Sequence, residues 1–260
     1  MLPGFNGFPE GQIIAFALVF LRVIAFVVAW PIFGTQLVPV PVKVLLALVL
    51  SVVLFPVIKM QNVDLIKIGD ELVFIAFREI VVGLFLGFLL KFFFFAVSIA
   101  GEMMGISSGL SSAQLFNPAM GSQTNVMEQA HLILATLFML AFNGHHLFIQ
   151  GLAQSFDLVP ISSMGIKFEG FSTLSLAVRD AFFMGIKMAS PVIVTVFVTN
   201  LTMGLLGRAV PQLNVMMTSF QVTIVIAVSV FFISIPLFVN EMDGLLQMMA
   251  ERFFSVLKVI

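Results

Sequence analysis

The chain of 260 residues is hydrophobic at 60% of its positions and charged at only 10%, and its mean hydropathy is +1.16. Soluble domains average about 25% charged residues, so this composition is typical of a membrane protein. The net charge of −1 excludes a nucleic-acid binder, which needs a basic surface, and the absence of cysteine excludes disulfides and thiolate metal sites.

Six apolar segments follow one another along the chain, and a spanning helix needs about 20 predominantly apolar residues. We therefore predict an all-α integral membrane protein with about six long hydrophobic helices and a short amphipathic tail at 240–260. The fourth helix could break near Asn143–Gly144. The predicted helical segments are 12–31, 42–58, 72–101, 127–152, 174–207 and 213–239.

Charged residues lie inside or at the edges of these apolar segments. A charge at the bilayer centre costs at least about 2.5 to 3.5 kcal/mol, so such residues must face protein or water. The adjacent charges at 78–79 and 179–180 fit helix ends at the membrane surface equally well. Lys91 and Lys187 fit that alternative less well, because apolar residues flank both. The candidates for pairing with another helix or subunit are Arg22, Arg78, Glu79, Lys91, Glu102, Glu128, Arg179, Asp180, Lys187 and Arg208.

Glycines recur at four-residue spacing in two places. Small residues at this spacing let helix backbones approach closely. Ordinary glycine enrichment in membrane helices explains any single pair equally well, but three pairs within 27 residues favour dense helix packing. The glycines concerned are Gly83, Gly87, Gly101, Gly105 and Gly109.

Phenylalanine dominates the aromatic residues, with 31 Phe against a single Trp, Trp30, and no Tyr. Trp and Tyr normally anchor spanning helices at both membrane surfaces. Phe lacks a polar end and suits dry packing between helices, so we expect a chain that is surrounded mostly by other protein.

The segment 101–121 departs from the apolar pattern, because it is rich in Gly, Ser and Met and carries only isolated large apolar residues. Non-helical backbone at membrane depth is tolerated only where protein buries it or where it lines a cavity, so this segment is a candidate pore loop or plug. A loop folded over the membrane surface is the alternative. The candidate plug residues are Gly105, Ile106, Leu110, Leu115, Phe116, Asn117 and Pro118.

Motifs of catalysis are weak or missing, and we expect no enzyme, no cofactor and no metal. Glu128 and His131 share a helix face, which is half of a carboxylate metal site, but the second half is missing. Neither a P-loop nor a Gly-x-Ser-x-Gly pattern occurs. Two rivals stay open. One is a channel, because 117–119 matches one of the two Asn-Pro-Ala motifs of aquaporins, and the other is a proton-coupled transporter that uses Glu128, His131 and the charges inside the apolar segments.

Six stretches of sequence carry a family resemblance, and they are Arg22 with Trp30–Pro31, 38–43, 101–105, 116–119, 141–146 and 204–214. Together they resemble the FliR family of flagellar biosynthetic proteins, whose counterpart in virulence injectisomes is the SctT family. No single stretch is decisive, but their co-occurrence in this order is specific and runs over nearly the whole chain.

The resemblance implies a structural subunit of the type III protein export gate, which is built from five FliP, four FliQ and one copy of this chain and has kinked helices. It implies a FliP-like part, 1–173, followed by a FliQ-like helical hairpin, 174–260, with its turn at 209–211. The segment 105–122 would plug the central pore, and the apolar constriction would consist of Leu110, Leu115 and Phe116.

The resemblance also implies a location in the bacterial inner membrane, at the flagellar basal body. Further partners would be lipid, other membrane proteins of the export apparatus and unfolded export substrates. Arg22, Lys91, Glu102 and Lys187 would pair across subunit interfaces instead of facing lipid. The choice of flagellar over virulence secretion rests on the resemblance alone.

Overall fold

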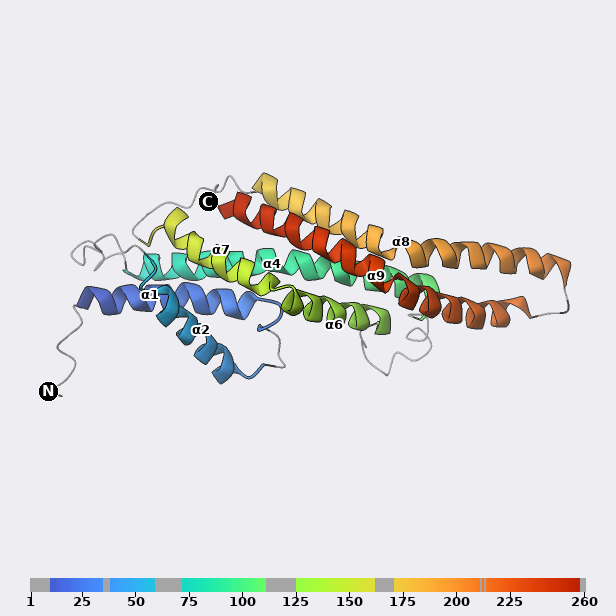
Figure 1. Ribbon diagram of the computed structural model, residues 1–260, viewed down its shortest axis with the longest axis horizontal. Coiled ribbons are helices and arrows are strands. Elements are labelled where there is room, and N and C mark those ends of the chain that lie inside the picture. Colours follow the sequence, from blue (N-terminus) through green and yellow to red (C-terminus); the bar gives the residue numbers. More distant parts are fainter. Residues whose placement is uncertain are drawn as a thin grey trace. The chain divides into compact units, whose positions relative to one another are not determined.

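The computed structural model describes residues 10–34, 38–58, 72–110, 125–161, 171–210, 212 and 214–257, and all regular structure in these residues is helical (Figure 1). The prediction of an all-α protein is confirmed for this part of the chain. The helices are α1 (Glu10–Ala29), α2 (Val40–Leu54), α4 (Leu72–Ser108), α6 (Val126–Ala141), α7 (Gly144–Leu158), α8 (Phe171–Ala209) and α9 (Val215–Leu257).

Four of these helices, α1, α4, α8 and α9, are long and apolar enough to cross a membrane, and the pair α6 and α7 adds a fifth if it counts as one broken span. The predicted break in the fourth segment is confirmed, because the pair is bent by 68° and Asn143 has a φ of 56°. Helix α2 has 15 residues, or about 22 Å, which is shorter than the roughly 30 Å of a hydrocarbon core.

Four predicted helix ends are wrong by four residues or more, because 58, 101, 152 and 239 stand against Leu54, Ser108, Leu158 and Leu257. Helix α4 continues seven residues beyond its predicted end at 101, so Gly105 and Ile106 are helical, and it ends at Gly109 with a φ of 80°. A left-handed glycine directly after the last turn is a common helix terminator. The tail predicted at 240–260 is no separate element either, because α9 runs through Asn240 without interruption to Leu257.

The chain divides into two compact units, which we describe separately. Unit 1 comprises residues 1–91, 145–175 and 249–260, and unit 2 comprises residues 92–144 and 176–248. Both units combine segments from the two halves of the sequence. The division into a FliP-like part and a FliQ-like part at 173–174 stays a prediction.

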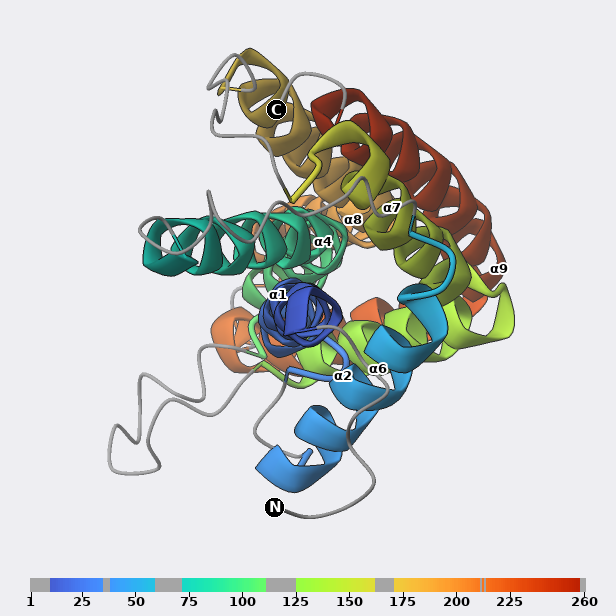
Figure 2. The ribbon, with the colours of Figure 1, turned by 90° about the vertical axis from the view of Figure 1, so that its left-hand side faces the viewer.

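In unit 1, α1 packs directly on the first half of α4 (Figure 2). A Cβ atom on Gly83 would collide with the carbonyl group of Arg22, and one on Gly87 would collide with Ala29. The close helix approach predicted from these glycines is therefore present. Trp30, at the end of α1, is 1% exposed and lies against the rings of Phe26 and Phe33, so it is part of the core of this unit.

In unit 2, α8 and α9 form an antiparallel hairpin (Figure 1). Thr223 of α9 donates a hydrogen bond of 3.0 Å to the side chain of Asn200 on α8. Near the opposite end, Lys187 forms an ion pair with Glu241. Helix α6 packs along α9, where the ring of His131 lies between those of Phe231 and Phe238.

Candidate functional site

A buried charge network in unit 1 brings together three of the predicted charged residues. Arg22 of α1 donates hydrogen bonds to both carboxylate oxygens of Glu79 on α4, from Nε at 2.6 Å and from Nη2 at 3.0 Å. Arg78 donates from Nη2 to the same carboxylate at 2.9 Å. Arg22 and Glu79 are 0% exposed and Arg78 is 2% exposed, so the chain itself encloses these three charged side chains.

Both arginines also bind the C-terminal end of α7. Arg22 donates to the carbonyl oxygens of Ser155 at 3.0 Å and Val159 at 2.9 Å. Arg78 donates to the carbonyl oxygens of Pro160 at 2.7 Å and Ile161 at 3.1 Å. The last carbonyl groups of a helix lack partners within the helix and carry a partial negative charge, so cations at this end stabilise it.

The network is well matched in charge. Two guanidinium groups face one carboxylate, and the negative end of α7 offsets the remaining positive charge. The Arg22 guanidinium also lies 4.2 Å from the ring centre of Phe156, a position that favours cation–π attraction. Such an arrangement holds no reactive group, but it fixes the register of α1, α4 and α7.

The structure does not bring the other predicted charges into this network. Lys91, Arg179 and Arg208 are exposed on the chain. Asp180 is bound by its neighbour Arg179, at 2.9 Å. The ammonium group of Lys187, half exposed, lies 2.7 Å from Glu241. The chain thus leaves Lys91, Arg179, Lys187 and Arg208 exposed, whereas Asp180 is only 6% exposed. Pairing of these charges across subunits stays a prediction.

A second cluster forms where α4 meets the start of α6, in unit 2. The Asn125 side-chain amide donates to the carbonyl oxygen of Gly101 and to the Glu102 carboxylate, both at 3.5 Å. The Glu128 carboxylate accepts a hydrogen bond from Ser98. A Cβ atom on Gly105 would collide with the Asn125 side chain. Gly105, at the start of the predicted plug segment, and Asn125, just after that segment, are thus in direct contact.

The plug residues themselves are only partly described. Gly105 and Ile106 belong to the last turns of α4, where Ile106 is 60% exposed, and Leu110 lies two residues beyond the end of the helix. The predicted plug residues Leu115, Phe116, Asn117 and Pro118 lie outside the described residues.

Sequence reasoning missed the α7 residues of the charge network and the role of Asn125. Ser155 and Val159 contribute mainly backbone oxygens, which leave no signal in the sequence. Asn125 did have a signal, because an Asn three residues before a Glu at the start of an apolar run predicts a helix N-cap. The side chain of Asn125 indeed accepts from the Met127 amide at 3.0 Å.

Glu128 and His131 do not form a joint site. His131 is 0% exposed, and its Nδ1 lies 2.7 Å from the carbonyl oxygen of Met127, while its Nε2 atom has no hydrogen-bond partner in the described residues. Glu128 instead points to Ser98. Within the described residues, no group of three side chains that could hold a metal ion occurs.

The chain is similar to known export proteins over most of its length. Residues 13–249 match a family described as bacterial export proteins, family 1. The flagellar biosynthetic protein FliR of Aquifex aeolicus is 29% identical over 249 residues, 95% of this chain and 93% of that protein. The FliR proteins of Bacillus subtilis and Escherichia coli are each 32% identical and cover 82% and 84% of this chain, which in turn covers 83% and 82% of them.

Proposed function

Since the chain belongs to the FliR family of bacterial export proteins, we propose that it forms and plugs the central pore of the flagellar type III protein export gate. It is a component of the flagellar export apparatus with several membrane-type helices. In the proposal it assembles in the bacterial inner membrane with five FliP-like and four FliQ-like subunits, and unfolded flagellar proteins pass through the gate. Its role is structural and not catalytic.

The observation that carries the assembly part is the length of the apolar exposed surface. On α4, exposed apolar side chains extend from Val73, 83% exposed, to Ile106, 60% exposed. These 33 steps along the helix span about 50 Å, well beyond the roughly 30 Å of hydrocarbon in a bilayer. Lipid alone does not cover such a surface, whereas neighbouring protein subunits would.

The plug part of the proposal is supported by the cluster around Asn125. Gly101 and Gly105 allow α6 to begin directly against the last turns of α4, so the described residues on the two sides of the predicted plug are packed together. A segment anchored at both ends suits a plug that is displaced and returns without changing the helices around it.

The assembly proposal is tested by co-expressing the chain with FliP-like and FliQ-like partners and weighing the purified complex by native mass spectrometry. We expect one copy of this chain in each complex. A chain that stays alone, and that moves ions or protons in vesicles by itself, would favour the channel or transporter alternative.

The plug proposal is tested in the same complex by measuring ion conductance in a planar bilayer. Replacing Leu110, Leu115 and Phe116 by Ala removes the apolar side chains that would keep the pore dry, so conductance is expected to rise. A triple variant that assembles but conducts no more ions than the unmodified complex would contradict the plug proposal.

A further inference from the structure

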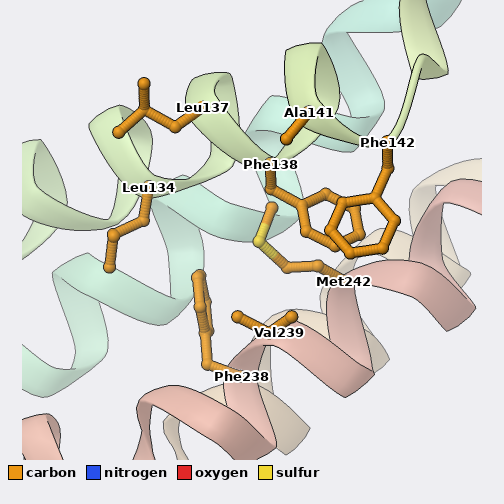
Figure 3. Close-up of a pocket in the computed structure, with 8 residues that line it drawn as sticks. All are labelled: Leu134, Leu137, Phe138, Ala141, Phe142, Phe238, Val239 and Met242. Atoms are coloured by element: carbon orange, nitrogen blue, oxygen red, sulfur yellow. The ribbon is translucent and has the colours of Figure 1, made fainter.

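An apolar pocket of about 220 Å³ lies between α6 and α9 in unit 2 (Figure 3). All eight side chains that line it are apolar. The rings of Phe138 and Phe142 stack 4.3 Å apart on the α6 side, and they face Phe238 and Met242 of α9. Leu137 and Phe142 are 58% and 57% exposed, so the pocket is open to the surroundings of the helices.

The pocket lies at the level where both helices change from apolar to polar sequence. Residues 215–239 of α9 contain no charged residue and are about 37 Å long, enough to cross a hydrocarbon core. Asn240, Glu241 and Asp243 follow at once, beside the pocket residue Met242. Helix α6 runs parallel to α9, as its contacts at His131 and in the pocket show, and it breaks at Asn143.

We propose that an acyl chain of a membrane phospholipid occupies this pocket, with its headgroup at the polar boundary marked by Asn143 and Asn240. The inference goes beyond the proposed export function and needs only that lipid reaches the surface of α6 and α9 around the pocket. The pocket continues the exposed apolar faces of two helices that are long enough, singly or as a bent pair, to span a bilayer.

The chemistry of the lining favours a lipid chain over a protein segment. Every lining residue is apolar, so the pocket lacks side-chain partners for the amide groups that a peptide would bring. A helix with its side chains is about 10–12 Å wide and would not enter. An apolar cavity of about 150 Å³ holds the six carbons of benzene, so this pocket holds about nine carbons in proportion, a large part of an acyl chain.

The proposal is tested in living cells that produce the full chain. The cells are fed a fatty acid with a diazirine group, which they build into their phospholipids, and the membranes are irradiated before the chain is purified. We expect adducts of phospholipid mass on peptides that contain residues 134–142 and 238–242. Adducts of free fatty acid mass, or adducts spread evenly over all exposed apolar positions, would overturn the proposal.

A matched pair of variants separates the pocket from general lipid contact. Ala141 lines the pocket, whereas the exposed Leu140 is its neighbour at the same level of α6 and does not. Because binding strengthens with each buried methylene, filling part of the pocket with Ala141→Phe is expected to lower the adducts there about tenfold. Leu140→Phe should leave them unchanged, and an equal response of both variants would overturn the proposal.

If the Ala141→Phe variant does not accumulate, one further measurement tests the lipid proposal. A photo-reactive phenylalanine in place of Leu137, at the exposed edge of the pocket, is expected to link to phospholipid. If it links mainly to another protein instead, the pocket binds a side chain of a neighbouring subunit and the proposal is wrong.

Discussion

Each unit of the chain contains an ion pair between two different helices, and the two pairs differ in their surroundings. In unit 1, Arg22 and Glu79 are completely buried, and the Glu79 carboxylate binds both Arg22 and Arg78. In unit 2, the side chain of Lys187 is 50% exposed and that of its partner Glu241 is 18% exposed. One pair is part of a protein interior, whereas the other lies on the outside of a helical hairpin.

The difference matters because burial decides what an ion pair does. Removing charges from water costs several kcal/mol per ion, and only good geometry with further hydrogen bonds offsets that cost. Arg22 has those bonds, to Glu79, Ser155 and Val159. An exposed pair stays largely hydrated and adds roughly 0 to 1 kcal/mol. Changes in unit 1 should therefore affect folding, and changes at Lys187 should affect what covers the hairpin.

The largest effect is expected from Glu79→Gln. The variant keeps the size of the side chain but leaves Arg22 and Arg78 without a buried counter-charge, which typically costs about 3 to 5 kcal/mol. The chain should largely fail to accumulate in membranes, as measured by immunoblotting, and any purified protein should unfold at a much lower temperature. Glu241→Gln is the matched control and should accumulate normally. Equal amounts of both variants would show that the buried network is dispensable.

A smaller but clear effect is expected from Gly83→Leu. Gly83 is one helical turn beyond Glu79 and touches the backbone of Arg22, so a side chain there pushes α1 away from the buried carboxylate. Such overpacking costs about 1 to 3 kcal/mol, and thermal unfolding of the purified chain measures it. Gly204 on α8 has nothing within 4 Å of a Cβ position. Gly204→Leu should leave the stability of the chain unchanged or raise it slightly, because Leu favours a helix over Gly, and similar losses for both variants would contradict the role assigned to the helix crossing.

Much of the helical fold is predictable from the sequence, because long apolar runs mark most of it. The predicted starts at 72 and 127 agree with Leu72 and Val126 within one residue. The predicted end of α4 at 101 is wrong because Gly, Ser and Met after that position resemble a loop. In the structure, Gly101 and Gly105 are the residues that let α6 pack against α4, so tertiary contacts keep this stretch helical.

The site was predictable in its residue types but not in its pairings. A charge inside an apolar segment indicates a buried partner, and Arg22, Arg78 and Glu79 follow that rule. Their order in the sequence does not reveal that they meet, because Arg22 and Glu79 are 57 positions apart. The carbonyl oxygens of α7 are common to all residues, so no sequence pattern marks them as partners.

The exposed ion pair of Lys187 and Glu241 is tested by Lys187→Met, which separates an effect on stability from an effect on assembly. In the chain alone this change should alter stability by less than about 1 kcal/mol, since Lys187 is half exposed. In cells, loss of the charge should lower the yield of complex with FliP-like and FliQ-like partners if Lys187 also faces a neighbouring subunit. Co-purification measures that yield. Normal stability together with normal assembly would remove Lys187 from the candidates for pairing across subunits.

The smallest expected effect on stability comes from His131→Leu. Like Arg22, His131 is buried, but among the described residues Arg22 has partners for all its N–H groups and His131 lacks a partner for one ring nitrogen. His131 has a contact to the Met127 carbonyl oxygen, but its Nε2 has no partner in the described residues. Leu loses that one hydrogen bond and removes an unsatisfied nitrogen, so the two changes should nearly cancel, within about 1 kcal/mol. Thermal unfolding measures the stability, and flagellar motility measures export. If the variant assembles with its partners but export stops, His131 takes part in proton transfer, and the transporter alternative gains support over a purely structural subunit.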